Sequence, residues 1–299
     1  MPTSGYLSAY NALPVNIRGM MLMLGATISF SLMHATIRYL SESLHPFQVA
    51  FFRNVFGLLV LAPILIRHKG APLRTRRLPL YLMRTTLNAI GMLSFFYALA
   101  IAPLAEVTAL SFLGPIFATV LGVVMLGETV GVRRWTAIGI GFLGALVILR
   151  PGFESVGLGS ILAIVASFSF GLMVMVIKRL GTTESALSIT TYMVALLVPV
   201  TLVPALFVWQ WPALELWPWL VIMGGLGSAA HLMMSGAIKL APTNVVMPVD
   251  FARLVWMALI GYMLFFEVPT VFTWLGGFMI FASATYVAYR ESQDRSKNA

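Results

Sequence analysis

The chain has 299 residues, of which 60% are hydrophobic and 10% are charged, and its mean hydropathy is +0.93. A soluble domain carries roughly 25% charged residues, so this composition excludes a water-soluble fold and predicts an all-α integral membrane protein. The formal net charge of +9 would suit nucleic-acid binding, but the basic residues flank hydrophobic segments, so we expect no nucleic-acid partner.

Ten apolar segments are long enough to cross a bilayer as helices, because a span needs about 20 residues. Residues 1–17 are too polar for the apolar part of a signal peptide, so we expect the first segment to remain as a span. In chain order the expected spans are 18–40, 46–66, 79–101, 103–125, 133–150, 157–180, 184–207, 218–240, 242–266 and 270–290. Only Ala102-Pro103 and Ala241-Pro242 separate two of the pairs, which predicts tight helical hairpins there.

An even number of spans places both termini on one side, and the basic residues indicate which side. On the terminal side lie Arg18, Arg67, Lys69, Arg74, Arg76, Arg77, Arg133, Arg134, Lys178, Arg179, Lys239, Arg290, Arg295 and Lys297. The other side has Arg38 and Arg150. The positive-inside rule therefore predicts cytoplasmic termini in a multi-pass protein of the bacterial-type cytoplasmic (inner) membrane.

The chain contains an internal duplication. Ala102-Pro103, Gly122, Glu128 and Trp135 recur with identical spacing as Ala241-Pro242, Gly261, Glu267 and Trp274, and the run at 29–33 is matched at 169–173. This divides the chain into halves of about 140 residues, which we assign to 1–152 and 153–299. Each half holds five expected helices, an odd number, so the two repeats are inverted. Inverted repeats suit alternating access in transporters.

Ten helices in two such halves, with Leu121-Gly122 to Gly127-Glu128 and Ile260-Gly261 to Phe266-Glu267 as a repeated signature, resemble the EamA family of the drug/metabolite transporter superfamily. The resemblance covers roughly residues 18 to 290. Phe266 stands where the first copy has Gly127, so the second copy is the weaker match. The resemblance implies a metabolite transporter, most similar in type to the YddG-like amino-acid exporters. The run at 51–54 is also similar to bacterial members that import S-adenosylmethionine or riboflavin.

Polar residues at membrane depth are candidate site residues, because an unpaired charge there is costly. We assign to a central substrate-binding cavity Arg84, Asn88, Asp250, Arg253, Ser29, Ser169, His231 and Trp256. We assign to an outer-mouth polar cluster His34, Arg53 and Glu106. Pro115 and Pro248 remove helical hydrogen bonds and are candidate bends for gates. For the serines and prolines, simple helix packing is the alternative role.

Helix depth predicts two ion pairs. Arg53 and Glu106 start at similar depths near the outer mouth, and Asp250 can bridge Arg84 and Arg253 in the inner half. Three deep arginines against two deep carboxylates leave one positive charge for a substrate carboxylate or phosphate. The alternative is an arginine that reaches a headgroup or backbone carbonyls.

No protease, esterase or nucleotide-binding motif is found, so we expect no enzyme. The chain has no cysteine, which excludes disulfides and thiolate metal sites, and we assign no metal and no cofactor. The expected function is export of small organic metabolites, first of all amino acids, with protons as the candidate coupling ion. The alternatives are import of S-adenosylmethionine or a riboflavin-like metabolite, and a non-transporting membrane scaffold or sensor. The bilayer and a small-molecule substrate are the expected partners, and both a monomer and a homodimer remain open.

Overall fold

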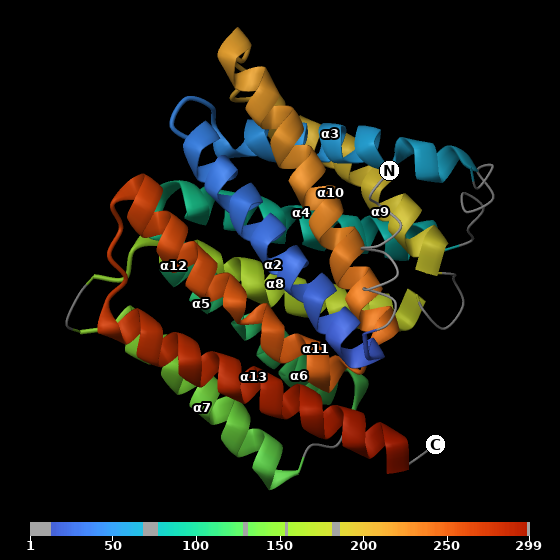
Figure 1. The fold of residues 1–299 in the computed structure, drawn as a ribbon, viewed down its shortest axis with the longest axis vertical. Helices are drawn as coiled ribbons and strands as arrows, with labels where there is room; N and C mark the ends of the chain where they lie inside the picture. Colours follow the sequence, from blue (N-terminus) through green and yellow to red (C-terminus); the bar gives the residue numbers. More distant parts are fainter. Residues whose placement is uncertain (1–12, 68–76, 128–130, 153–154, 181–185, 298–299) are drawn as a thin grey trace.

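The structure is a computed structural model that describes residues 13–67, 77–127, 131–152, 155–180 and 186–297 (Figure 1). The described residues form long helices joined by short connections. The first half contains α2 (Val15–Leu40), α3 (Pro46–Arg67), α4 (Leu78–Ile101), α5 (Leu104–Ser111), α6 (Leu113–Leu126) and α7 (Val132–Leu149). The second half contains α8 (Leu158–Leu180), α9 (Ala186–Leu206), η2 (Leu214–Leu216), α10 (Trp217–Leu240), α11 (Thr243–Asp250), α12 (Ala252–Phe265) and α13 (Val271–Lys297).

Seven of the helical segments, counting each broken pair as one, are long and apolar enough to cross a membrane. They are Val15–Leu40, Leu104–Met125, Val132–Leu149, Leu158–Ile177, Leu214–Leu240, Val245–Phe265 and Val271–Tyr289. Shorter apolar helices lie at Pro46–Val60 and Ala195–Leu206. The start of α2 and the end of α13 lie at the same end of the bundle, opposite the connection between α12 and α13 (Figure 1).

The expected spans 103–125 and 242–266 are not continuous helices. The first breaks at Phe112, between α5 and α6, and the second breaks at Phe251, between α11 and α12. At each break a backbone N–H donates to the carbonyl three residues earlier, from Phe112 N to Ala109 O and from Phe251 N to Pro248 O, which winds the chain more tightly than an α-helix. Pro115 and Pro248 flank these breaks, and their missing N–H groups leave carbonyls unpaired in the preceding turn.

Helices pair across the two halves of the chain. The helix α2 packs along α10, α4 packs along α8, and α7 packs along α13. In the last pair, a Cβ added to Gly144 would lie 2.7 Å from the carbonyl oxygen of Gly276, so the two backbones touch. Small residues allow such close approach, which is the usual basis of helix association in a bilayer.

The two hairpins share their backbone geometry. Ala102 has φ −128° and ψ 160°, and Ala241 has φ −133° and ψ 153°. After the following broken helix, Gly127 and Phe266 both end it in the left-handed conformation, with φ of 67° and 56°. Glycine suits that conformation and phenylalanine rarely adopts it, so the second copy keeps the turn despite its less suitable residue.

Candidate functional site

One face of α2 carries the candidate site. Thr27, Phe30, His34 and Arg38 follow one another at helical spacing and all contact other helices. Thr27 accepts a hydrogen bond from the indole of Trp256 on α12 at 3.3 Å. Because this face runs from the middle of α2 to its end, it links the interior of the bundle to the end away from the chain termini.

An ion pair lies at the middle of this face. Asp250 Oδ2 accepts a hydrogen bond from Arg253 Nη2 at 3.0 Å, across the break at Phe251. The Arg253 guanidinium carbon lies 5.1 Å from the ring centroid of Phe112 and 5.9 Å from that of Phe30. The two side chains keep 18% and 21% of their surface exposed, so the pair remains accessible to a ligand. Aromatic rings next to a cation can also receive planar or cationic groups.

Both intramembrane histidines surround Phe30. The His231 ring meets the Phe30 ring edge-on at 5.1 Å between centroids. The buried His34 ring stacks on Phe30 at 6.1 Å and meets the Phe95 ring edge-on at 5.0 Å. Arg53 and Arg253 lie within electrostatic range of His34. Histidines and arginines from α2, α3, α10 and α12 thus converge, and Asp250 is the carboxylate that contacts this group.

His231 is exposed, although other residues on the same face of α10 are buried. Gly227 and Ser228, one turn earlier on α10, are buried against α2 and α3, where Ser228 donates to the carbonyl of Gly57 at 3.2 Å. His231 and Ser235 continue that face and are both exposed. This face of α10 is therefore exposed from His231 onward, whereas Ala237 and Ala241 on another face remain buried against α2.

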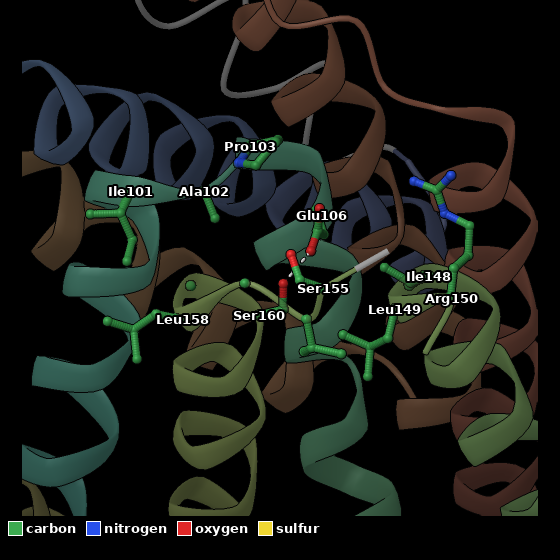
Figure 2. Close-up of a pocket in the computed structure, with 13 residues that line it drawn as sticks. Ile101, Ala102, Pro103, Glu106, Ile148, Leu149, Arg150, Ser155, Leu158 and Ser160 are labelled. Atoms are coloured by element: carbon green, nitrogen blue, oxygen red, sulfur yellow. Dashed lines mark hydrogen bonds between the residues drawn. The ribbon is translucent and has the colours of Figure 1, made fainter. Parts of the chain in front are cut away.

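The expected ion pair between Arg53 and Glu106 is wrong. Arg53 donates to the neighbouring Asn54 Oδ1 at 3.1 Å, and Asn54 in turn donates to Thr201 of α9 at 3.2 Å. Glu106 accepts a hydrogen bond from Ser160 Oγ of α8 at 2.5 Å and lines a pocket of about 240 Å³ between α5, α7 and α8 (Figure 2). His34 and Arg53 therefore belong together near α10, and Glu106 belongs to a separate place.

The expected bridge from Asp250 to Arg84 is also not formed. Arg84 is 5% exposed, and its Nη2 lies 3.3 Å from Met193 Sδ of α9. Its Nε and Nη1 have no hydrogen-bond partner. Among the described contacts, Arg84 and Arg53 therefore both lack a carboxylate partner, and Arg253 is the deep arginine that pairs with Asp250.

The remaining candidates are spread over the bundle. Ser29 and Asn88 are half-buried, Ser169 is buried, and Pro115 and Pro248 are exposed. Sequence reasoning selected the amide of Asn88 and missed that of Asn54, which is 3% exposed and joins α3 to α9. It also treated Arg38 as a topology marker and Glu267 as part of a signature, and the structure brings these two together.

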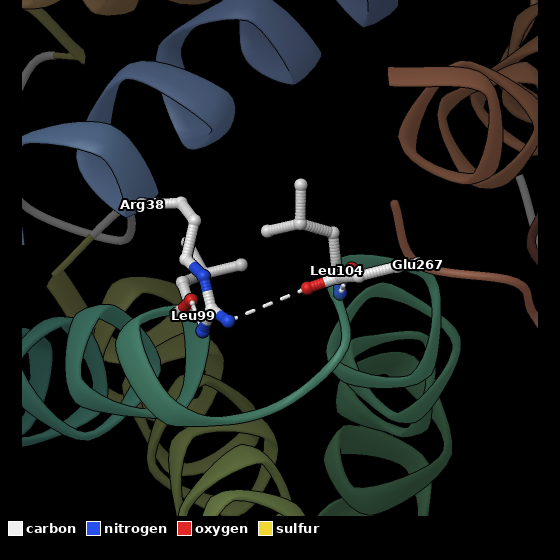
Figure 3. Close-up of polar contacts among 4 residues, drawn as sticks. All are labelled: Arg38, Leu99, Leu104 and Glu267. Atoms are coloured by element: carbon white, nitrogen blue, oxygen red, sulfur yellow. Dashed lines mark hydrogen bonds and ion pairs between the residues drawn. The ribbon is translucent and has the colours of Figure 1, made fainter. Parts of the chain in front are cut away.

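Glu267 and Arg38 form a second polar cluster where α2, α4, α5 and α12 end (Figure 3). Arg38 Nη2 lies 3.5 Å from Glu267 Oε1, and Arg38 Nη1 donates to the carbonyl of Leu99 at 3.0 Å. Glu267 Oε2 accepts from the backbone N–H of Leu104 at 2.8 Å. Glu267 lies in the connection after α12, where burial raises the pKa of its carboxyl, and the Leu104 bond and Arg38 offset part of that rise.

Comparison with known proteins agrees with this arrangement of two halves. The EamA-like transporter family matches residues 17–150 and again residues 157–289. The chain belongs to the EamA-like transporter family. One solved structure has the same fold, with a TM-score of 0.61 at 15% identity, over 91% of this chain and 98% of that chain.

The most similar relatives move small molecules across membranes. An S-adenosylmethionine uptake transporter of Rickettsia prowazekii is 29% identical over 96% of this chain and 97% of its own length. A riboflavin transporter of Vibrio cholerae is 30% identical, over 93% and 95%. A pseudopaline exporter of Pseudomonas aeruginosa is 28% identical, over 88% and 93%. This EamA-like protein is thus a multi-pass membrane protein of a small-molecule transporter family.

Proposed function

We propose that the protein takes up a metabolite of the size and chemistry of S-adenosylmethionine or riboflavin across the bacterial cytoplasmic membrane. The amino-acid export expected from the sequence becomes the second candidate. The uptake transporter of Rickettsia prowazekii and the riboflavin transporter of Vibrio cholerae each match more of the chain than the exporter does, at slightly higher identity. We rank S-adenosylmethionine ahead of riboflavin because the Asp250–Arg253 pair can bind an amino-acid group.

The architecture that we propose has ten membrane-spanning helices in two inverted repeats, 1–152 and 153–299, with cytoplasmic termini. Reciprocal pairing supports it, because α2 packs on α10 as α8 packs on α4, which exchanges the first and third helix of each half. The matched hairpin and helix-end geometries support it as well. Exchange of the two halves' conformations would then alternate the side to which the centre opens.

The Asp250–Arg253 pair is the observation that carries the substrate class. A carboxylate and a guanidinium side by side can bind the two ends of an α-amino-acid group, whose ammonium and carboxylate are equally close together. The rings of Phe30 and Phe112 beside Arg253 provide apolar faces for a planar ring system. S-adenosylmethionine contains both groups, whereas riboflavin contains only the planar ring system.

Purified protein reconstituted in liposomes tests this function. Labelled S-adenosylmethionine and labelled riboflavin are offered outside, and uptake is compared with empty liposomes. Saturable, protein-dependent uptake of either compound supports the proposal. Flux of labelled amino acids alone would favour the exporter, and no flux of any metabolite would favour the scaffold.

Individual alanine variants separate a transporter from a scaffold. A scaffold tolerates Asp250→Ala and Arg253→Ala with unchanged partner binding, whereas a transporter loses flux while size-exclusion chromatography still shows a folded protein. A competition experiment tests the chemical selectivity. An excess of S-adenosylhomocysteine should inhibit uptake of S-adenosylmethionine more strongly than an excess of 5′-methylthioadenosine, because 5′-methylthioadenosine lacks the amino-acid group.

A further inference from the structure

The cluster of Arg38, Leu99, Leu104 and Glu267 joins the two halves of the chain (Figure 3). Glu267 follows α12 in the second half, and its two partners, Arg38 and Leu104, belong to the first half. The hydrogen bond between Glu267 and Leu104 joins residues 163 positions apart. Alternating access requires the halves to separate at each end in turn, so this contact must break whenever that end opens.

The chemistry of the cluster suits a contact that closes and opens. Pro103 precedes α5 without an N–H group, and the Leu104 N–H has no intrahelical acceptor, as in any first turn. The Glu267 carboxylate satisfies this N–H and the positive end of the α5 dipole. Water can replace the carboxylate when the helices part, so opening leaves no backbone group stranded.

Arg38 connects the cluster to the substrate site. It lies one turn beyond His34 on the same face of α2, and its guanidinium also contacts the Phe265 ring at 5.9 Å. Behind it, Phe95 and His34 are 7% and 5% exposed, so the route from this end to Phe30 is filled. At the opposite end His231 and Ser235 are exposed on α10. The described conformation is thus closed on the side of Glu267.

We infer that Arg38 and Glu267 are the gating residues of the outer end, and that Glu267 closes it by capping α5 across the interface between the halves. The inference rests on the proposed transport function and on the proposed orientation with cytoplasmic termini. Two other charged side chains near this end, Glu106 and Arg150, have contacts of their own. Arg38 of α2 faces Glu267, Glu106 of α5 is held by Ser160, and Arg150 lies over the Phe272 ring of α13 at 4.7 Å.

A disulfide across the gate tests whether the outer ends separate. A Cβ added to Gly261 would lie 3.9 Å from the Cβ of Leu104, which is close to the spacing of about 3.8 Å in disulfides. The native chain has no cysteine, so Leu104→Cys/Gly261→Cys forms one defined cross-link. We expect oxidation to stop uptake and reduction to restore it, with both single variants unaffected by oxidation. Unchanged uptake by the oxidised double variant would overturn the gate.

A second experiment needs no substrate. A cysteine placed at Phe95, behind the gate, is labelled from outside the liposome with a membrane-impermeant maleimide. Glu267→Ala should raise the labelling rate about tenfold or more, as expected for loss of a charge-assisted hydrogen bond. Glu267→Gln keeps a neutral acceptor for the Leu104 N–H, as the protonated carboxyl does, and should leave the labelling rate close to the native rate. A cysteine at the exposed Trp211 serves as the control for general accessibility.

The outcomes separate the two proposals. Equal labelling in the native, Glu267→Gln and Glu267→Ala backgrounds would overturn the gate even if metabolites are taken up. Faster labelling in Glu267→Ala than in the native and Glu267→Gln backgrounds, without uptake of any metabolite, would uphold the gate and reject the transported substrate class. Cross-linking that leaves uptake intact would reject the gate and uphold the function.

Discussion

Asp250 and Arg253 face each other across a broken helix, with 3.0 Å between Oδ2 and Nη2. They lie three positions apart, and Phe251 interrupts the helix between them. A continuous helix would also bring these positions together, but the break lets α11 and α12 move separately. The ion pair is therefore a link between two helical segments as well as a candidate substrate contact.

Asp250→Asn should lower both stability and transport. Breaking a buried ion pair costs about 3–5 kcal/mol, and we expect about 1–3 kcal/mol here because about a fifth of each side chain is exposed. Thermal unfolding in detergent and liposome uptake measure the two effects. Glu42→Gln, at an exposed turn residue, is the matched loss of a carboxylate. Wild-type uptake by Asp250→Asn, with and without a pH gradient, would show that the pair is structural.

Arg84→Met should have opposite effects on stability and transport. The buried guanidinium has two nitrogens without partners, so its removal should stabilise the protein by about 1–3 kcal/mol. If Arg84 meets an anionic group of the substrate in another conformation, uptake falls, and Arg84→Lys retains part of it. A stabilised Arg84→Met variant with full uptake would exclude Arg84 from the substrate path.

Acidity should favour the closed outer end. Burial raises the pKa of Glu267 above its ordinary value of 4.5, and hydration in an open gate returns it toward that value. The closed state therefore binds the proton more tightly than the open state. The equilibrium shifts toward the closed gate as pH falls through the raised pKa, and this shift is lost as pH rises through it. The ratio of the labelling rate at Phe95→Cys to the labelling rate at Trp211→Cys should rise as pH increases above 4.5. Glu267→Gln should remove that dependence.

Gly144→Val should disrupt the pairing of α7 with α13. A Cβ at Gly144 would lie 2.7 Å from a backbone oxygen and 2.9 Å from the Met279 Cβ, neither of which can yield easily. We expect a loss of about 1–3 kcal/mol, the usual cost of overpacking. Gly139→Val is the matched control on the same helix, because nothing lies within 4 Å of a Cβ there. Equal melting temperatures of the two variants would contradict this packing.

The sequence alone was sufficient to predict the helical ranges, the duplication and the family. Bilayer thickness demands long apolar runs, and Ala102-Pro103 and Ala241-Pro242 mark two of the places where the chain turns. The breaks at Phe112 and Phe251 were less accessible, because Pro115 and Pro248 indicate a bend without fixing its position. The repeated glutamate was visible as a signature, but its partner was not.

Only the tertiary structure decided which charges meet. Counting residues gives the depth of a side chain along its helix, but not the direction in which it leaves the helix or the helix that faces it. Arg53 and Glu106 therefore seemed paired at similar depth, although Arg53 contacts Asn54 and Glu106 contacts Ser160. Arg38 and Glu267 lie near the ends of two different helices, and nothing in the sequence paired them. The packing of α2, α5 and α12 brings them together. Composition and periodicity are properties of single helices, whereas an ion pair depends on how helices rotate and pack against one another.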